Sequence, residues 1–87
     1  MTKTKRSYKA IELAKIVEGE LLANQDKIIK GVSSAEKPQK NTVVFAENEK
    51  YLKKAEKNGA DLIITSKELK SNFDLIKVEN PRLAYAS

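Results

Sequence analysis

The stretch VVFAENEKYL, from Val43 to Leu52, decides how this sequence is interpreted. Residues Thr42–Phe45 are β-branched or aromatic, which favours a strand. Asn48 then suits a helix N-cap, and the following residues predict a helix over Glu49–Lys57. A strand that passes directly into a helix indicates a mixed α/β domain.

Outward from this stretch, the N-terminal half predicts one helix and two strands. Apolar spacing favours a helix over Ala10–Val17, which Gly19 would end as a left-handed cap. Strands are expected at Glu20–Ala23 and Ile28–Val32. Because the residues between them are turn-like, these strands are interpreted as a hairpin.

The C-terminal half continues the alternation. Leu62–Thr65 is an apolar run typical of a strand covered on both faces, and Leu75–Val78 is a further strand. Ser66 is expected to cap a brief turn of helix through Leu69, and Asn80-Pro81 to open a last helix. We therefore expect a basic flexible arm over residues 1–9 and a single α/β domain over residues 10–87, truncated before a further domain.

Composition narrows the function classes. The 87 residues contain no cysteine and no histidine, which excludes disulfides and thiolate metal sites and removes the commonest general base. No cofactor and no metal is expected. No apolar run approaches the ~20 residues of a membrane span, and the N-terminus is not a signal peptide, so a cytoplasmic location is expected.

The net charge is +5, with much of the excess in the N-terminal arm, and the lysines are interleaved with acidic residues. This pattern is more typical of a solvated surface than of a dense basic stripe, so no nucleic acid is expected as partner.

Phe45, Asn48 and Tyr51 form the candidate binding motif. Two aromatic rings can hold a flat heterocycle between them, and an amide can hydrogen-bond its edge. The competing interpretations are core packing for Phe45 and helix capping for Asn48. Asn48 could cap the helix and bind a ligand at once, whereas core packing, which also applies to Tyr51, is an alternative to ligand contact.

The charged neighbours of the motif are ambiguous. Lys50, Lys53 and Lys54 are interpreted either as phosphate contacts or, with more weight, as a solvated helix face. Glu47 and Glu49 flank Asn48 and are assigned no catalytic role, because carboxylates are favourable at the start of a helix.

Several local patterns, in order, resemble one known family. They are Glu12-Leu13-Ala14, Gly19-Glu20-Leu21, Ile29-Lys30-Gly31-Val32, Val44-Phe45, Asn48, Lys50-Tyr51-Leu52, Gly59-Ala60, Ile63-Ile64, Val78 and Asn80-Pro81-Arg82-Leu83-Ala84-Tyr85-Ala86. Together they resemble the N-terminal, uridine-binding domain of UDP-3-O-acylglucosamine N-acyltransferase, an enzyme of lipid A biosynthesis. Two positions depart from the family pattern, namely Lys9 in place of Ser or Thr and Glu49 in place of Pro.

This resemblance implies a fold shared with the N-terminal domains of muramyl ligases and a uracil held between Phe45 and Tyr51, with Asn48 beside it. It also implies a homotrimeric parent that transfers a 3-hydroxyacyl group from acyl carrier protein to UDP-3-O-acylglucosamine. The family's left-handed β-helix and its catalytic histidine are missing from this sequence, so the segment alone is expected to be non-catalytic. A small nucleic-acid-binding domain and a purely structural or interaction domain are the alternatives.

Overall fold

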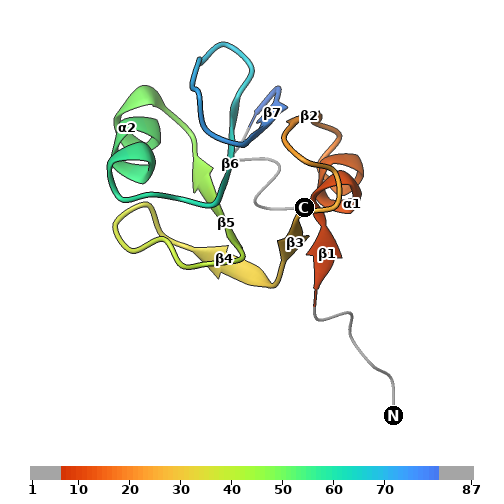
Figure 1. Cartoon of the computed structure of the whole chain (residues 1–87). Coiled ribbons are helices and arrows are strands. Elements are labelled where there is room, and N and C mark those ends of the chain that lie inside the picture. Colours follow the sequence, from red (N-terminus) through yellow and green to blue (C-terminus); the bar gives the residue numbers. More distant parts are fainter. Residues whose placement is uncertain (1–6, 81–87) are drawn as a thin grey trace.

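A computed structural model describes residues 7–80 of the chain (Figure 1). In chain order its elements are β1 (Tyr8–Lys9), α1 (Ala10–Ile16), β2 (Glu20–Leu22), β3 (Ile28–Ile29), β4 (Gly31–Ser33), β5 (Thr42–Ala46), α2 (Glu49–Lys57), β6 (Leu62–Ser66) and β7 (Leu75–Val78). No helix among these is long and apolar enough to cross a lipid bilayer.

A mixed five-stranded sheet in the order β2-β7-β6-β5-β4 forms the centre of the domain. Strands β4, β5, β6 and β7 run parallel, and β2 pairs antiparallel with β7 at one edge. A separate antiparallel pair joins β1 to β3. The expected small mixed-sheet α/β fold is confirmed.

The two helices cover opposite faces of this sheet (Figure 1). We call the buried side chains on one face the α1-side cluster: Ala10, Ala14, Ile29, Val43, Leu62, Ile64, Ile76 and Val78. Those on the other face are the α2-side cluster: Ala35, Val44, Ala46, Leu52, Ala55, Ala60, Ile63 and Leu75. Because successive strand residues point to opposite faces, an apolar run such as Leu62–Ile64 supplies both clusters.

The predicted hairpin of Glu20–Ala23 with Ile28–Val32 is wrong. β2 pairs with β7, with Glu20 opposite Lys77, and the segment expected at Ile28–Val32 is split into β3 and β4. The turn between β2 and β3 instead accepts hydrogen bonds from the start of α1. The N–H groups of Ala10 and Ile11 donate to the carbonyls of Lys27 and Gln25, which satisfies two donors that a helix start leaves unpaired.

The expectation that Gly19 is a left-handed helix cap is also wrong. Glu18 takes the left-handed conformation, with φ of 56°, and Gly59 is the only glycine within residues 7–80 that has a positive φ. Gly19 is required by packing, since a Cβ at this position would lie 2.6 Å from Cγ2 of Ile76. Gly59, by contrast, follows the C-cap Asn58 of α2 in the left-handed conformation, with φ of 79°.

Smaller differences concern the element ends. Tyr8 and Lys9 belong to β1, although the sequence assigned them to a flexible arm. Ser66 closes β6, and only a hydrogen-bonded turn follows it, in which the N–H of Leu69 donates to the Ser66 carbonyl. The helix predicted at Asn80-Pro81 and most of the predicted arm lie outside the described residues.

The presence of Lys9, where the family pattern has Ser or Thr, has a local explanation. A lysine side chain cannot accept a hydrogen bond and so cannot cap a helix as Ser or Thr does. Here the side chain of Glu12 accepts from the Lys9 N–H at 2.8 Å, which forms the reciprocal half of a capping box.

Candidate functional site

The turn between β5 and α2 lies at the carboxyl edge of the parallel strands. Ligands of open α/β sheets bind at this edge, beyond the strand ends. The end of β5 is fixed from β6, because Oγ1 of the fully buried Thr65 donates to the Ala46 carbonyl at 2.8 Å. Phe45 therefore lies at a firmly held strand end, and Asn48 and Tyr51 follow it at the start of α2.

Asn48 is the N-cap of α2. Its Oδ1 accepts from the Tyr51 N–H at 3.0 Å, and its backbone is extended, as at an N-cap. The capping interpretation of Asn48 is therefore confirmed. The exposed side-chain Nδ2 has no hydrogen-bond partner among the described residues, so both of its N–H groups remain available to a ligand.

Phe45 and Tyr51 approach this turn from opposite sides of the sheet. Phe45 is half-buried and packs against the α1-side cluster, whereas Tyr51 is half-buried and packs against the α2-side cluster. The two rings thus belong to different apolar clusters, with the end of β5 and Asn48 between them in sequence. Each ring retains partial exposure.

Lys54 links Tyr51 to the loop that precedes β5. Its Nζ lies 5.7 Å from the centroid of the Tyr51 ring and 3.2 Å from a carboxylate oxygen of Glu36. The carboxyl of Glu36 has its pKa lowered, by a hydrogen bond from its own backbone and by the Lys54 ammonium. The carboxylate of Glu36 is therefore negative at neutral pH.

An open hollow of about 410 Å³ lies along the same side of α2. It is lined by Glu36, Lys50, Lys53, Lys54, Lys57 and Asn58. Sequence reasoning identified three of these lysines but missed Lys57, Asn58 and Glu36. The spacing of the four lysines was a signal for the first omission, because positions i, i+3, i+4 and i+7 share one face of a helix. The loop residue Glu36 offered no such signal.

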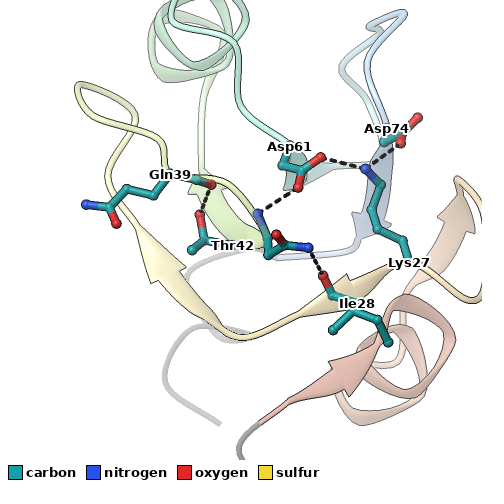
Figure 2. A network of polar contacts seen from close by, with 7 residues as sticks. Lys27, Ile28, Gln39, Thr42, Asp61 and Asp74 are labelled. Atoms are coloured by element: carbon teal, nitrogen blue, oxygen red, sulfur yellow. Dashed lines mark hydrogen bonds and ion pairs between the residues drawn. The ribbon is translucent and has the colours of Figure 1, made fainter.

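A polar network occupies the opposite, amino-terminal edge of the strands (Figure 2). Nζ of Lys27 lies 2.6 Å from Oδ1 of Asp61 and 3.2 Å from Oδ2 of Asp74, and Oδ2 of Asp61 accepts from the Asn41 N–H. Asn41 in turn donates through Nδ2 to the Ile28 carbonyl. The network joins the segments that lead into β3, β5, β6 and β7, and the sequence analysis did not anticipate it.

The charges in this network shift each other's pKa values. Burial raises the pKa of Asp61, but the hydrogen bond from Lys27, the Asn41 N–H and the charges of Lys27 and Lys40 outweigh it and lower the pKa below 3.8. Burial lowers the pKa of Lys27, yet its hydrogen bonds to Asp61 and Asp74 and the charges of both raise it above 10.5. Both groups are therefore charged at neutral pH, and their role is to tie strands together.

Comparison with known proteins finds a family model and several relatives that carry the same enzyme name. Residues 26–87 match the family model described as UDP-3-O-(3-hydroxymyristoyl) glucosamine N-acyltransferase, LpxD. UDP-3-O-acylglucosamine N-acyltransferase of Acinetobacter baylyi is 35% identical over 83 residues, and the protein of that name from Methylacidiphilum infernorum is 33% identical over 82. These alignments cover 91% and 92% of this chain but only 23% of each relative. The chain thus spans about a quarter of the length of the curated relatives it matches.

Proposed function

We propose, because this chain belongs to the UDP-3-O-(3-hydroxymyristoyl) glucosamine N-acyltransferase family, that it is the uridine-recognition segment of such an enzyme. Its ligand is the uridine of a UDP-3-O-acylglucosamine acceptor. The observation that carries the proposal is the β5–α2 turn. There a capping amide lies, in sequence, between two half-exposed aromatic residues at the carboxyl edge of the parallel strands.

The two ends of the Asn48 amide have different roles, which supports this proposal. Its Oδ1 is committed to the helix cap, so its contribution to a ligand is the pair of N–H donors on Nδ2. Uracil carries two carbonyl acceptors on its edge, which match such donors. Adenine has an amino donor where uracil has a carbonyl and accepts only through ring nitrogens, so it lacks the two carbonyl acceptors.

The positions of Phe45 and Tyr51 support a base held across the end of the sheet. Each ring is anchored in a different cluster, so the two rings flank the turn from its two sides. A base inserted over the turn then meets Phe45 on the α1 side and Tyr51 on the α2 side. One aromatic stack contributes about 1–3 kcal/mol, so two stacks contribute about 2–6 kcal/mol. This range includes the ~4 kcal/mol of a millimolar dissociation constant, so the isolated segment binds a uridine nucleoside at about millimolar affinity.

The remaining parts of the proposal concern the whole enzyme. It transfers a 3-hydroxyacyl group from acyl carrier protein to the acceptor's 2-amino group, in lipid A biosynthesis, as a cytoplasmic homotrimer. The family membership and the printed names of the relatives support the acyltransferase activity. The segment itself supplies recognition and no catalysis, which its lack of histidine and its 23% share of the relatives support.

A titration of the isotopically labelled chain with uridine tests the proposal. We expect uridine to shift the amide resonances of residues 45–51 at millimolar concentration, whereas adenosine leaves them unchanged. Tyr51→Leu should remove the response. Phe73→Leu is the matched control, because Phe73 is a half-buried aromatic residue of the same α2-side cluster.

Unmoved resonances at ten millimolar uridine would contradict the proposal. The competing nucleic-acid function predicts a different result from the same sample. Single-stranded RNA would then shift the resonances with little base preference, and its affinity would fall steeply as salt is added.

A further inference from the structure

Lys54 differs from the other lysines of α2 because it is half-buried. Its side chain is 35% exposed, whereas that of the adjacent Lys53 is 71% exposed. The Nζ of Lys54 lies 5.7 Å from the centroid of the Tyr51 ring and donates to Oε2 of Glu36 at 3.2 Å. Because Tyr51 and Lys54 are three residues apart, they share one face of the helix. The ammonium is thus held between an aromatic ring and a carboxylate.

The loop that carries Glu36 is bound to the same helix. Ala35 is buried in the α2-side cluster, and its carbonyl accepts from Nδ2 of Asn58 at 2.9 Å. Asn58 is about one helical turn beyond Lys54, so the loop contacts α2 at two successive turns. Glu36 follows Ala35 directly, so its carboxylate reaches Lys54 from an anchored backbone.

These contacts act on the Tyr51 ring, which is half-buried and packs against the α2-side cluster. A side chain that is free to change its rotamer must be ordered when a ligand stacks on it, and this ordering weakens binding. An ammonium over an aromatic ring is attracted to the negative face of the ring. A carboxylate that anchors the ammonium keeps this contact in place, so the ring is ordered before a ligand arrives.

We propose that Glu36 and Lys54 are positioning residues for base recognition. Glu36 holds the Lys54 ammonium against the Tyr51 ring, and the ammonium fixes the ring in the orientation that stacks on the base. This role rests on the proposed function, since a ring that binds no base needs no such orientation. Neither residue has to touch the ligand, in contrast to Asn48, whose Nδ2 donates to it directly under the proposed function.

The first measurement needs no ligand. NMR spectra of the labelled 87-residue chain give the ring resonances of Tyr51, and we expect Glu36→Gln and Lys54→Leu to shift them. The matched control is Lys53→Leu, which removes the neighbouring lysine, paired with Glu49 at 3.8 Å, and should leave the ring resonances unchanged. Leucine has a helix propensity close to that of lysine, so these variants retain the fold, which circular dichroism checks.

The second measurement is the uridine affinity of the same proteins. Glu36→Gln and Lys54→Leu should each weaken uridine binding about two- to fivefold, from the magnitude of an exposed ion pair. Glu36→Gln should have no further effect in a chain that already carries Lys54→Leu, because the carboxylate acts through the ammonium. Lys54→Arg should keep the wild-type affinity, since a guanidinium also binds a carboxylate and an aromatic face.

Added salt separates this role from a purely structural one. Uridine is uncharged at neutral pH, so salt has little direct effect on its binding. Screening of the pair between Glu36 and Lys54 should nevertheless weaken uridine binding by the wild type and leave that of Lys54→Leu unchanged. A pair that only stabilised α2 would change the unfolding transition and not the uridine affinity of the folded chain.

Equal uridine affinities of the wild type, Glu36→Gln and Lys54→Leu would overturn the positioning role and leave the uridine proposal standing. Unchanged ring resonances of Tyr51 in Glu36→Gln would overturn it as well. Equal losses of affinity in Lys53→Leu and Lys54→Leu would also do so, because the effect would then be one of overall charge. A wild type that does not respond to uridine would contradict the uridine proposal and the positioning role together.

Discussion

Lys27 and Asp61 form an ion pair with 2.6 Å between Nζ and Oδ1, although 34 residues separate them in the sequence. Lys27 precedes β3, and Asp61 precedes β6. Asp61 also accepts from the N–H of Asn41, at the residue before β5 (Figure 2). One carboxylate thus connects three segments of the chain at the edge of the sheet opposite the candidate site.

Replacing this carboxylate is expected to destabilise the domain. Asp61→Ala should lower the free energy of unfolding by about 1.5–3 kcal/mol, because it removes hydrogen bonds to a charged, partly buried group. Only 21% of the Lys27 side chain and 27% of the Asp61 side chain are exposed, so solvent screens this pair less than a surface pair. Chemical denaturation of both proteins measures the difference.

The control for this variant is Asp26→Ala. Asp26 pairs with Lys9 at 3.6 Å, but the two side chains are 69% and 54% exposed. Its replacement should change the free energy of unfolding by less than about 0.5 kcal/mol. Equal effects of the two substitutions would show that the buried network contributes no more than a surface ion pair.

The ion pair between Lys27 and Asp61 also predicts how stability depends on pH. The pKa of Asp61 is lower in the folded state than its ordinary value of 3.8, so folding holds this proton less tightly and acid favours unfolding. The stabilisation is present above the ordinary value and is lost as the pH falls through the lower, folded value. Lys27 behaves in the opposite sense, and its contribution is lost as the pH rises above 10.5.

We therefore expect the stability difference between the wild type and Asp61→Asn to be constant from about pH 5 to about pH 9. It should shrink below about pH 4 and again above about pH 10.5. Urea denaturation at a series of pH values measures this. A difference that grows on acidification would have the wrong sign for a lowered pKa at Asp61.

The sequence predicted β5 and α2 correctly because the signals for these elements are local. Strand propensity over residues 42–45 and the Asn48 cap both act within a few residues. The partner of β2 could not be found in this way. Glu20 lies opposite Lys77, and the turn chemistry nearby favoured a hairpin that tertiary pairing overrides.

The same distinction holds for the candidate site. The motif from Phe45 to Tyr51 is contiguous, so its residues and the Asn48 cap were accessible from the sequence. Glu36 reaches the hollow from a loop 18 residues away from Lys54, and no pattern in the sequence marks that contact. That Phe45 and Tyr51 pack on opposite faces also follows only from the packing of α2 on the sheet.

Gly19 offers a prediction about packing. In Gly19→Ala, the added Cβ would lie 2.6 Å from Cγ2 of Ile76, 2.8 Å from Cγ1 of Val78 and 2.9 Å from the Lys77 carbonyl. Relief of this overlap requires β7 to shift, so we expect a loss of about 1–3 kcal/mol in the free energy of unfolding. Thermal denaturation measures it.

Gly31→Ala is the matched control, because a Cβ at Gly31 meets no atom within 4 Å and Gly31 has no positive φ. Alanine there should be neutral or slightly stabilising. If the two variants were equally stable, the close approach of Gly19 to β7 would not constrain the fold.

Phe45 yields a prediction for a full-length enzyme that contains this segment. Phe45→Leu keeps an apolar side chain against the α1-side cluster but removes the ring that would stack on uracil. Loss of one stack should weaken acceptor use roughly ten- to a hundredfold in kcat/KM. An unchanged kcat/KM for the acceptor in a variant of normal thermal stability would exclude Phe45 from the site.

Asn48 allows helix capping to be separated from ligand recognition. Aspartate keeps an oxygen that accepts from the Tyr51 N–H, so Asn48→Asp should retain the stability of α2. It carries no N–H donor for a uracil carbonyl and adds a negative charge beside it. We therefore expect near-normal unfolding and at least a tenfold loss of uridine affinity. Asn48→Ala should lose uridine affinity and also about 1 kcal/mol of stability, because the helix cap is removed. Normal uridine binding by Asn48→Asp would limit Asn48 to its role as a helix cap.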